Sequence, residues 1–320
     1  MKLGASMKGA ALVMARRLPG LLLTLLVSSI FIFSAMYLAP GNPVSALTGG
    51  RQVSPAAEKA LEAEYHLNDS FVSQYLHWLG GAVHGDFGTS YVARGQSVGS
   101  QIVDRLPTTL LLLAMASLAV FIFGVLLGSI AAIRGRRTES VITTVTAVGM
   151  GIPSFVAGSF LISFFAVRLG WFPVFGPGEG LPDQIYHLIL PTIALALATL
   201  AYVAQVSRVA IGNELNRDHV DTAYARGMGG GWVIRKHVLR NAAIPITTVC
   251  GVTIAFLITG TAVVEQVFQL NGIGSLLIDS VISKDLPMVQ GICFVAVIAI
   301  VLINLVVDGL YGVLDPRVRR

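Results

Sequence analysis

Few side chains in this sequence have the types and spacing that chemistry requires. His66, His77 and His84 fall in one segment, and the last two are seven residues apart, so they could share a helix face and bind nickel or haem iron. No carboxylate or cysteine completes a metal set, which favours surface positions instead. Cys250 and Cys293 form no Cys-x-x-Cys or Cys/His metal spacing, and we interpret them as small buried apolar residues.

Two acidic side chains stand beside long apolar runs. Glu265 and Asp308 each follow such a run, and ionisable groups near membrane depth are functional candidates by default. Either could face a wet cavity and meet an amino group, although Asn304 and Asp308, four residues apart, could equally bond across helices. The sequence contains no HExxH, no GxSxG and no motif-bearing aspartate pair, which argues against an intramembrane enzyme.

The elements that position these residues are membrane-spanning helices. The 320-residue chain is 54% hydrophobic and 12% charged, whereas soluble domains carry about 25% charged residues. A helix needs roughly 20 apolar residues to cross the hydrocarbon, and lipid offers the backbone no hydrogen bonds. We therefore predict an all-α polytopic membrane protein with six transmembrane helices. The six runs without Asp, Glu, Lys or Arg are residues 20–38, 107–133, 141–167, 188–206, 244–264 and 289–307.

The first run has an alternative interpretation as a signal-peptide core. Basic residues precede it, namely Lys2, Lys8, Arg16 and Arg17. Signal cores contain roughly 7–15 apolar residues and are followed by a small-x-small cleavage site. This run is longer and no such site follows it, so a transmembrane helix is the better prediction.

The distribution of charge predicts the topology. If the N-terminus is cytoplasmic, most of the 22 Lys and Arg fall in cytoplasmic segments, while acidic residues gather outside. Cytoplasmic loops carry an excess of basic residues, so both termini should lie in the cytoplasm. The net charge of +5 then reflects membrane orientation rather than nucleic-acid binding, for which no basic face interleaved with aromatics is present.

The spans divide the chain into four segments. We predict an N-terminal tail with the first transmembrane helix over 1–40, an outer segment over 41–106, a five-helix core over 107–312 and a cytoplasmic tail over 313–320. Within the outer segment, Ser54 is a fair N-cap for a short helix over 56–67 with Pro55 in its first turn. A second short helix should span Phe71–Val83. The outer segment is too small for a strong core of its own and should cap the bundle.

A polar loop at residues 208–245, between the fourth and fifth spans, is the most informative stretch. Asp218 and Asp221 have capping-box spacing, which predicts a helix over 219–226. Gly227 supplies a left-handed residue to end it, and glycines 229–231 should stay pliable. A second short helix should follow over 232–241.

Pro245 should then mark the start of the fifth span, since proline is tolerated in a first turn. A short helix in this loop could sit in another protein's groove and be pushed as a rigid body. The alternative is a solvated loop whose basic residues serve only to keep this segment on the cytoplasmic side, as the positive-inside rule describes.

Small or helix-softening residues gather in two spans and permit close contact and bending. They are Gly149, Gly151, Pro153 and Ser154 in the third span, and Gly251, Thr253, Gly260 and Thr261 in the fifth. Either these helices line and gate a pathway, or they simply pack tightly. As candidate pathway or gate residues we take Pro153, Ser154, Gly251, Gly260, Glu265 and Asp308.

The loop carries recognisable motifs. Asp221, Thr222, Ala223 and Gly227 resemble the EAA-x-x-x-G loop of ABC importer permeases, and 237–245, HVLRNAAIP, is similar to the HALRNALLP variant of the dipeptide/oligopeptide/nickel branch. An ordered series extends the resemblance over almost the whole chain and points to the B-type subunit. It comprises APGNP at 39–43, GDFGTS at 85–90, RLPTTL at 105–110, IPSF at 152–155, RLGWFP at 168–173, VVEQVF at 263–268, GIG at 272–274 and LDPR at 314–317.

The resemblance implies a machine in the bacterial cytoplasmic membrane. A paralogous C-type permease would complete the pathway, two ABC ATPase subunits would dock on the loops, and an extracytoplasmic solute-binding protein would deliver substrate. ATP and Mg would bind in the ATPase subunits. This chain has no G-x-x-x-x-G-K-[ST] loop to cradle phosphates, so it should be a non-ATPase pore subunit with no cofactor of its own. A receptor or channel acting alone is the rival hypothesis.

The resemblance also implies roles for the loop residues. ATPase coupling would involve Asp221, Thr222, Ala223, Tyr224, Ala225, Arg226, Gly227 and Met228; support would come from His237, Leu239, Arg240, Asn241 and Pro245. Two departures are Asp221 in place of Glu, and glycines 229–231 in place of polar helix formers. Dipeptides or short oligopeptides are the expected substrates, with nickel chelates, glutathione and haem as alternatives.

Overall fold

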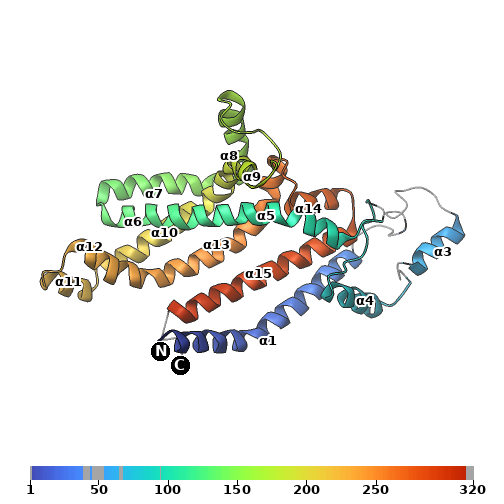
Figure 1. The fold of residues 1–320 in the computed structure, drawn as a ribbon, viewed down its shortest axis with the longest axis horizontal. Helices are drawn as coiled ribbons and strands as arrows, with labels where there is room; N and C mark the ends of the chain where they lie inside the picture. Colours follow the sequence, from blue (N-terminus) through green and yellow to red (C-terminus); the bar gives the residue numbers. More distant parts are fainter. Residues whose placement is uncertain (1, 39–43, 45–53, 65–67, 94, 315–320) are drawn as a thin grey trace. The chain divides into compact units, whose positions relative to one another are not determined.

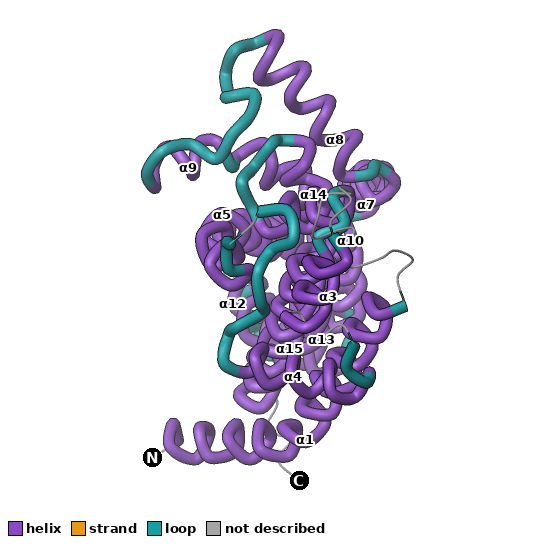
Figure 2. Tube along the Cα trace, turned by 90° about the vertical axis from the view of Figure 1, so that its right-hand side faces the viewer, coloured by secondary structure: helices purple, strands orange, loops and turns teal. Residues whose placement is uncertain are grey.

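The protein is helical throughout the described residues. The computed structural model describes residues 2–38, 44, 54–64, 68–93 and 95–314, and for 2–16, 36, 61, 64 and 307–314 it describes the backbone alone. Figure 2 shows purple helices joined by teal loops over this part of the chain. Extended pairing there is limited to an isolated antiparallel bridge between Thr89 and Ser97.

Five helices in the described ranges are long and apolar enough to cross a membrane, and a bent pair makes up to six. The first lies in α1 (Lys2–Tyr37). The second, Val98–Ile133, joins α5 (Val98–Ala119) to α6 (Val125–Ile133) through a π-helical turn. The others are α10 (Ile189–Leu215), Gly230–Val267, and α15 (Leu286–Leu314). The predicted all-α class with six candidate spans is confirmed at this level.

The third span is broken, which corrects the prediction of one continuous helix over 141–167. Helix α7 (Arg136–Gly151) and helix α8 (Ser154–Leu161), which continues in π form to Arg168, are bent by 99°. The residue before a proline is pushed out of the α region, and Ile152 is extended with ψ 116°. Pro153 is extended too, with ψ 142°, and its carbonyl accepts from Ala157 N at 3.0 Å to start α8. The apolar run concealed this break because residues 141–167 contain no Asp, Glu, Lys or Arg on either side of it.

Two predicted span starts lie inside longer helices. Helix α5 begins at Val98, within the predicted outer segment, and contains Pro107. Pro245 lies inside α13 (Leu239–Val267) rather than in a first turn. The apolar runs locate the hydrocarbon-crossing part of a helix but not its polar ends, so helices extend beyond them.

The short outer helices follow their local signals. Helix α3 (Pro55–Glu64) is capped by Ser54, whose Oγ accepts from Ala57 N at 3.3 Å. The predicted extension over 65–67 lies outside the described residues. Helix α4 (Phe71–Val83) has the predicted bounds and is capped by Ser70. Between the last two spans, α14 (Ile273–Ile282) forms a further short helix.

The chain divides into two compact units. Residues 1–17, 110–270 and 302–320 form unit 1, and residues 18–109 and 271–301 form unit 2. In unit 1, α6, α10 and α13 run side by side (Figure 1), and the core includes Leu112, Val203 and Leu257. The core of unit 2 includes Val98, Met288 and Ile292.

Glycines allow the closest approach in unit 1. At Gly128 of α6 an added Cβ would lie 2.5 Å from the Ala204 carbonyl oxygen of α10, nearer than atoms can stand without moving the backbone. Gly124 makes the same accommodation for Val203, at 2.9 Å. Small residues let membrane helices pack backbone to backbone, so this pair fixes α6 against α10.

Candidate functional site

A short helix, α11 (Asp218–Ala225), lies between α10 and the long helix that begins at Gly230. Its N-cap is Arg217, with φ −93° and ψ 141°, and no side chain caps it. The predicted capping box at Asp218 is therefore wrong, because Asp218 is already helical. Both Asp218 and Asp221 stand in the first turn, where the helix dipole favours negative charge.

The end of α11 is a Schellman motif. Gly227 has φ +76°, as predicted for a left-handed terminator. Its N–H donates to Tyr224 O at 2.9 Å, and Met228 N donates to Ala223 O at 3.2 Å, the two bonds that define the motif. The glycine turns the chain sharply at the end of α11.

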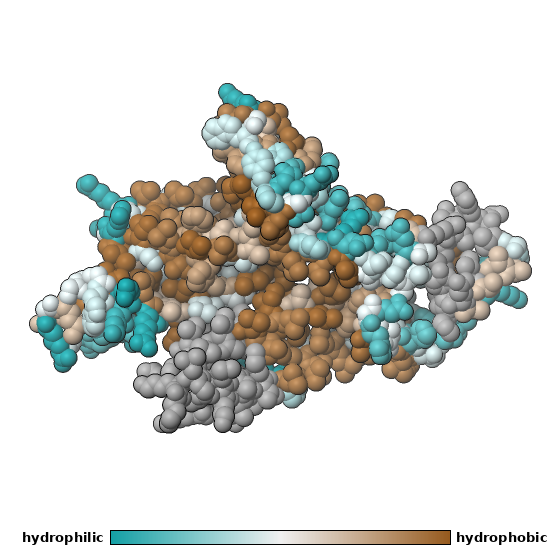
Figure 3. Space-filling view, in the orientation of Figure 1, coloured by the Kyte–Doolittle hydropathy of each residue, from teal (hydrophilic) through white to brown (hydrophobic). Residues whose placement is uncertain are grey.

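Helix α11 has one buried face and one open face. Val220 and Ala223 are buried in a cluster with Ile211 of α10, Val233, Val238, Ala242 and Ile246. Asp218, Asp221, Thr222, Tyr224, Ala225, Arg226 and Gly227 are exposed, and Met228 is partly buried. Figure 3 shows hydrophilic residues gathered over α11 and α12, next to the apolar surface of α6 and α7. The helix is thus seated on the bundle with its polar side free.

The predicted second short helix over 232–241 is not separate. Helix α12 (Gly230–Val233) passes through a π-helical stretch, Ile234–Val238, into α13. Gly229 is the N-cap, and its carbonyl accepts from Trp232 and Val233 at 3.0 and 3.1 Å. Gly230 and Gly231 are helical rather than pliable. Gly229 serves as the N-cap, where glycine is acceptable, and the helix that starts there continues into α13.

The predicted support residues differ in their surroundings. Leu239 packs against the cluster below α11, whereas Arg240 and Pro245 are exposed. The His237 ring lies 5.2 Å from that of Trp232. Asn241 Nδ2 donates to Glu214 Oε2 at 3.4 Å and lies 3.3 Å from His219 Nε2.

Glu214 and His219 were missed by the sequence reasoning. Glu214 is the one acidic residue of α10 and falls in the arginine-rich segment 208–245, and that contrast was the available signal. Arg217 Nε pairs with Glu214 Oε1 at 3.3 Å, and His219 Nε2 lies 3.8 Å from Glu214 Oε2. The four side chains form one polar network.

The candidate gate residues do not form a single cluster. Pro153 and Ser154 stand at the break in the third span, while Gly251 is buried in α13. At Gly260 an added Cβ would lie 2.9 Å from Leu195 Cδ1 of α10. Glu265 is fully buried within α13, not beyond its end as predicted. Asp308 lies inside α15, and its side chain is outside the described residues.

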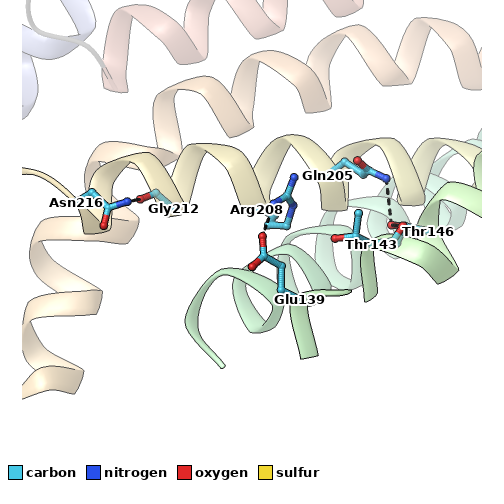
Figure 4. A network of polar contacts seen from close by, with 7 residues as sticks. All are labelled: Glu139, Thr143, Thr146, Gln205, Arg208, Gly212 and Asn216. Carbon is cyan, nitrogen blue, oxygen red and sulfur yellow. Dashed lines mark hydrogen bonds and ion pairs between the residues drawn. The ribbon is translucent and has the colours of Figure 1, made fainter. Parts of the chain in front are cut away.

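A polar seam joins α7 to α10 (Figure 4). The Arg208 guanidinium pairs with the Glu139 carboxylate, and Gln205 Nε2 donates to Thr146 Oγ1 at 3.3 Å. Thr143 lies between these contacts on the same face of α7. The seam ties the first half of the broken span to the helix that leads into α11.

The outer histidines make no metal site in the described part of the chain. His84 Nδ1 contacts Gly80 O at 2.8 Å within its own turn. His77 lies on α4, and His66 is outside the described residues. No group of three His, Cys, Asp or Glu able to hold a metal occurs among the described residues.

The chain is similar to known membrane proteins over nearly its whole length. Residues 124–320 match the family described as "Binding-protein-dependent transport system inner membrane component", and residues 11–113 match the N-terminal part of the same membrane components. The chain belongs to this family of permeases. It is the permease subunit of an ABC importer, a multi-pass inner membrane protein of the dipeptide/oligopeptide branch.

Relatives match the permease over nearly its whole length. The glutathione transport system permease protein GsiC of Shigella flexneri serotype 5b (strain 8401) is 37% identical over 95% of this chain and 97% of its own. The oligopeptide transport system permease protein AppB of Bacillus subtilis (strain 168) is 37% identical over 92% and 95%. Such permeases work with ATPase and binding-protein subunits and are themselves pore subunits.

The fold of the permease also has solved counterparts. A chain of the MetNI methionine ABC transporter in inward facing conformations matches with a TM-score of 0.57 and 16% identity, covering 67% of this chain and 96% of that chain. A second crystal form gives a TM-score of 0.52. At this identity the likeness shows the shared fold of the helices.

Proposed function

We propose that α11 is the coupling helix on which a partner ATPase pushes. One observation carries this proposal: α11 is seated on the bundle through Val220 and Ala223, yet presents Asp221, Thr222 and Ala225 to solvent. A helix held in this way moves as a rigid body and transmits a push to its apolar seat, the buried cluster of Ile211, Val233, Val238, Ala242 and Ile246. The residues that would meet the ATPase are the solvent-facing ones of 221–228, whereas Ala223 faces the bundle.

The proposed assembly contains two permeases, this chain and a C-type paralogue. Two ABC ATPase subunits bind ATP and Mg beneath them, and an extracytoplasmic binding protein delivers substrate. The chain itself hydrolyses no nucleotide and binds no cofactor. Both termini lie in the cytoplasm, because the basic residues of the Arg134–Arg137 turn and of the α11 loop then fall inside.

The transport cycle would be alternating access. Closure of the ATPases moves α11, and its apolar seat passes that movement to α10 and α13, because both helices contribute side chains to the seat. The break at Pro153 and the close approach at Gly260 give the third and fifth spans places to bend or slide. Pro153, Ser154, Gly251, Gly260, Glu265 and Asp308 remain the proposed pathway or gate residues.

Short peptides are the proposed substrates. The AppB relative is an oligopeptide permease by name, and the GsiC relatives are glutathione permeases. Glutathione is the second candidate because the GsiC match is equally extensive. Uptake of labelled dipeptide and of labelled glutathione, each by the complete complex with its binding protein, decides between them: the cargo is whichever accumulates with ATP.

Site-directed crosslinking tests the coupling assignment. Ala225→Cys, in a chain carrying Cys250→Ala and Cys293→Ala, is expected to crosslink to the ATPase subunit in the purified complex. Ser73→Cys, on the exposed face of α4, is the matched control and should capture no ATPase. If an ATPase copurifies yet only the control position crosslinks to it, α11 is not the coupling helix. If no ATPase ever copurifies, the permease acts alone.

A further inference from the structure

A single carboxylate joins three elements of the permease. Glu214 is the last residue but one of α10, and its side chain is 14% exposed. It accepts from Asn241 of α13 at 3.4 Å, pairs with Arg217 at 3.3 Å, and lies 3.8 Å from His219 Nε2 of α11. Asn241 and His219 also touch each other, at 3.3 Å. Each of the three helices therefore contributes a side chain to the same contact set.

The network also faces a cavity. Glu214, Arg217 and Asn241 line a space of about 590 Å³ between α10 and α13, together with Gln205 of the α7–α10 seam. Beside this space, Ile211 of α10 and Ala242 of α13 are buried in the same apolar cluster, so the two helices pack together next to the network. The contact from Asn241 to Glu214 adds a directional polar link between α10 and α13 to that packing.

The apolar seat and the polar network do different work. Burial of Val220 and Ala223 holds α11 to the bundle, but apolar burial is non-directional and would let α11 rotate or slide. Exposed ion pairs add little stability, and Arg217 is 63% exposed. Charge-assisted hydrogen bonds nevertheless impose direction, so the network is suited to orient α11 rather than to keep it folded.

We propose that Glu214 is a positioning residue that locks the orientation of α11 to the inner ends of α10 and α13, so that a push on α11 moves both helices together. This inference rests on the proposed role of α11. It predicts that loss of the Glu214 carboxylate uncouples ATP hydrolysis from transport while the complex stays assembled.

The test is the number of ATP molecules hydrolysed per substrate transported, measured for the complete complex in liposomes. Glu214→Gln and Glu214→Ala are expected to raise this ratio, the alanine variant by on the order of five-fold, the lower end of typical coupling between sites. Asn213→Ala is the matched control, because Asn213 lines the same cavity and is exposed; it should keep the wild-type ratio. Melting temperature and ATPase content should match in all variants.

Exchanging the carboxylate and the amide between positions 214 and 241 gives a second test. A residue that only stabilises the fold would not regain coupling through such an exchange. Asn241→Asp alone sets two carboxylates together and should raise the ratio. Combined with Glu214→Gln, it returns one carboxylate and one amide to the network, beside His219, and should restore coupling towards the wild-type ratio. If Glu214→Ala does not assemble, Glu214→Gln and Asn241→Ala decide the question.

The inference is overturned if assembled Glu214→Gln and Asn241→Ala complexes transport with the wild-type ratio, or if Asn213→Ala is equally uncoupled. Failure of the proposed function has a different signature. In that case Ala225→Cys fails to crosslink to the ATPase in the wild-type background, whatever position 214 contains.

Discussion

Gly227 occupies a backbone conformation that any side chain would strain. Its φ is +76°, and no neighbouring atom lies within 4 Å of an added Cβ, so the cost of a substitution is in the backbone alone. A left-handed non-glycine residue costs roughly 1–2 kcal/mol. We expect Gly227→Ala to reorient α11 and to lower ATP-dependent uptake in membrane vesicles, while the amount of inserted permease stays unchanged.

The control for this change is Gly212→Ala. Gly212 lies inside α10 with ordinary helical φ, and an added Cβ would meet open space. Alanine is favoured over glycine within helices, so uptake should match wild type. Normal uptake by Gly227→Ala would show that the left-handed turn has no part in coupling.

Close packing of whole helices makes a second prediction. Because a Cβ at Gly128 would approach Ala204 O of α10 to 2.5 Å, Gly128→Ala must push α6 from α10. Overpacking of this kind costs about 1–3 kcal/mol. The purified variant should melt at a lower temperature, whereas Gly20→Ala, where the space is open, should not. Equal melting of the two variants would mean that α6 and α10 are not in contact at Gly128.

The break between α7 and α8 gives a third prediction. Pro153→Ala restores an N–H and removes the ring that forces Ile152 into extended backbone. The 99° bend should relax, so spin labels at Val145 and Phe160, both exposed, should move apart in pulsed dipolar measurements. Uptake should fall if the bend gates the pathway. An unchanged label distance would assign the bend to packing against α10 rather than to proline.

Local signals predicted the local structure of this protein well. Ser54 and Phe71–Val83 took their expected places, and Gly227 adopted the left-handed conformation, because each depends on a few neighbouring residues. Tertiary features were missed for the converse reason. The seat below Val220 and the contacts of Glu214 join residues from separate helices, and the continuity of α12 with α13 overrode the breaking tendency of glycines 229–231.

At the scale of the whole molecule, the predicted orientation distinguishes two faces of the membrane. That orientation is predicted from the excess of basic residues in the segments assigned to the cytoplasm, because Lys and Arg bias the direction of insertion. In a chain carrying Cys250→Ala and Cys293→Ala, we expect Ser73→Cys on α4 to react with a membrane-impermeant thiol reagent in spheroplasts. Arg137→Cys and Ala225→Cys, both exposed, should react only in inside-out vesicles. Labelling of Ala225→Cys from the outside would place α11 beyond reach of a cytoplasmic ATPase and would remove the basis of the coupling assignment.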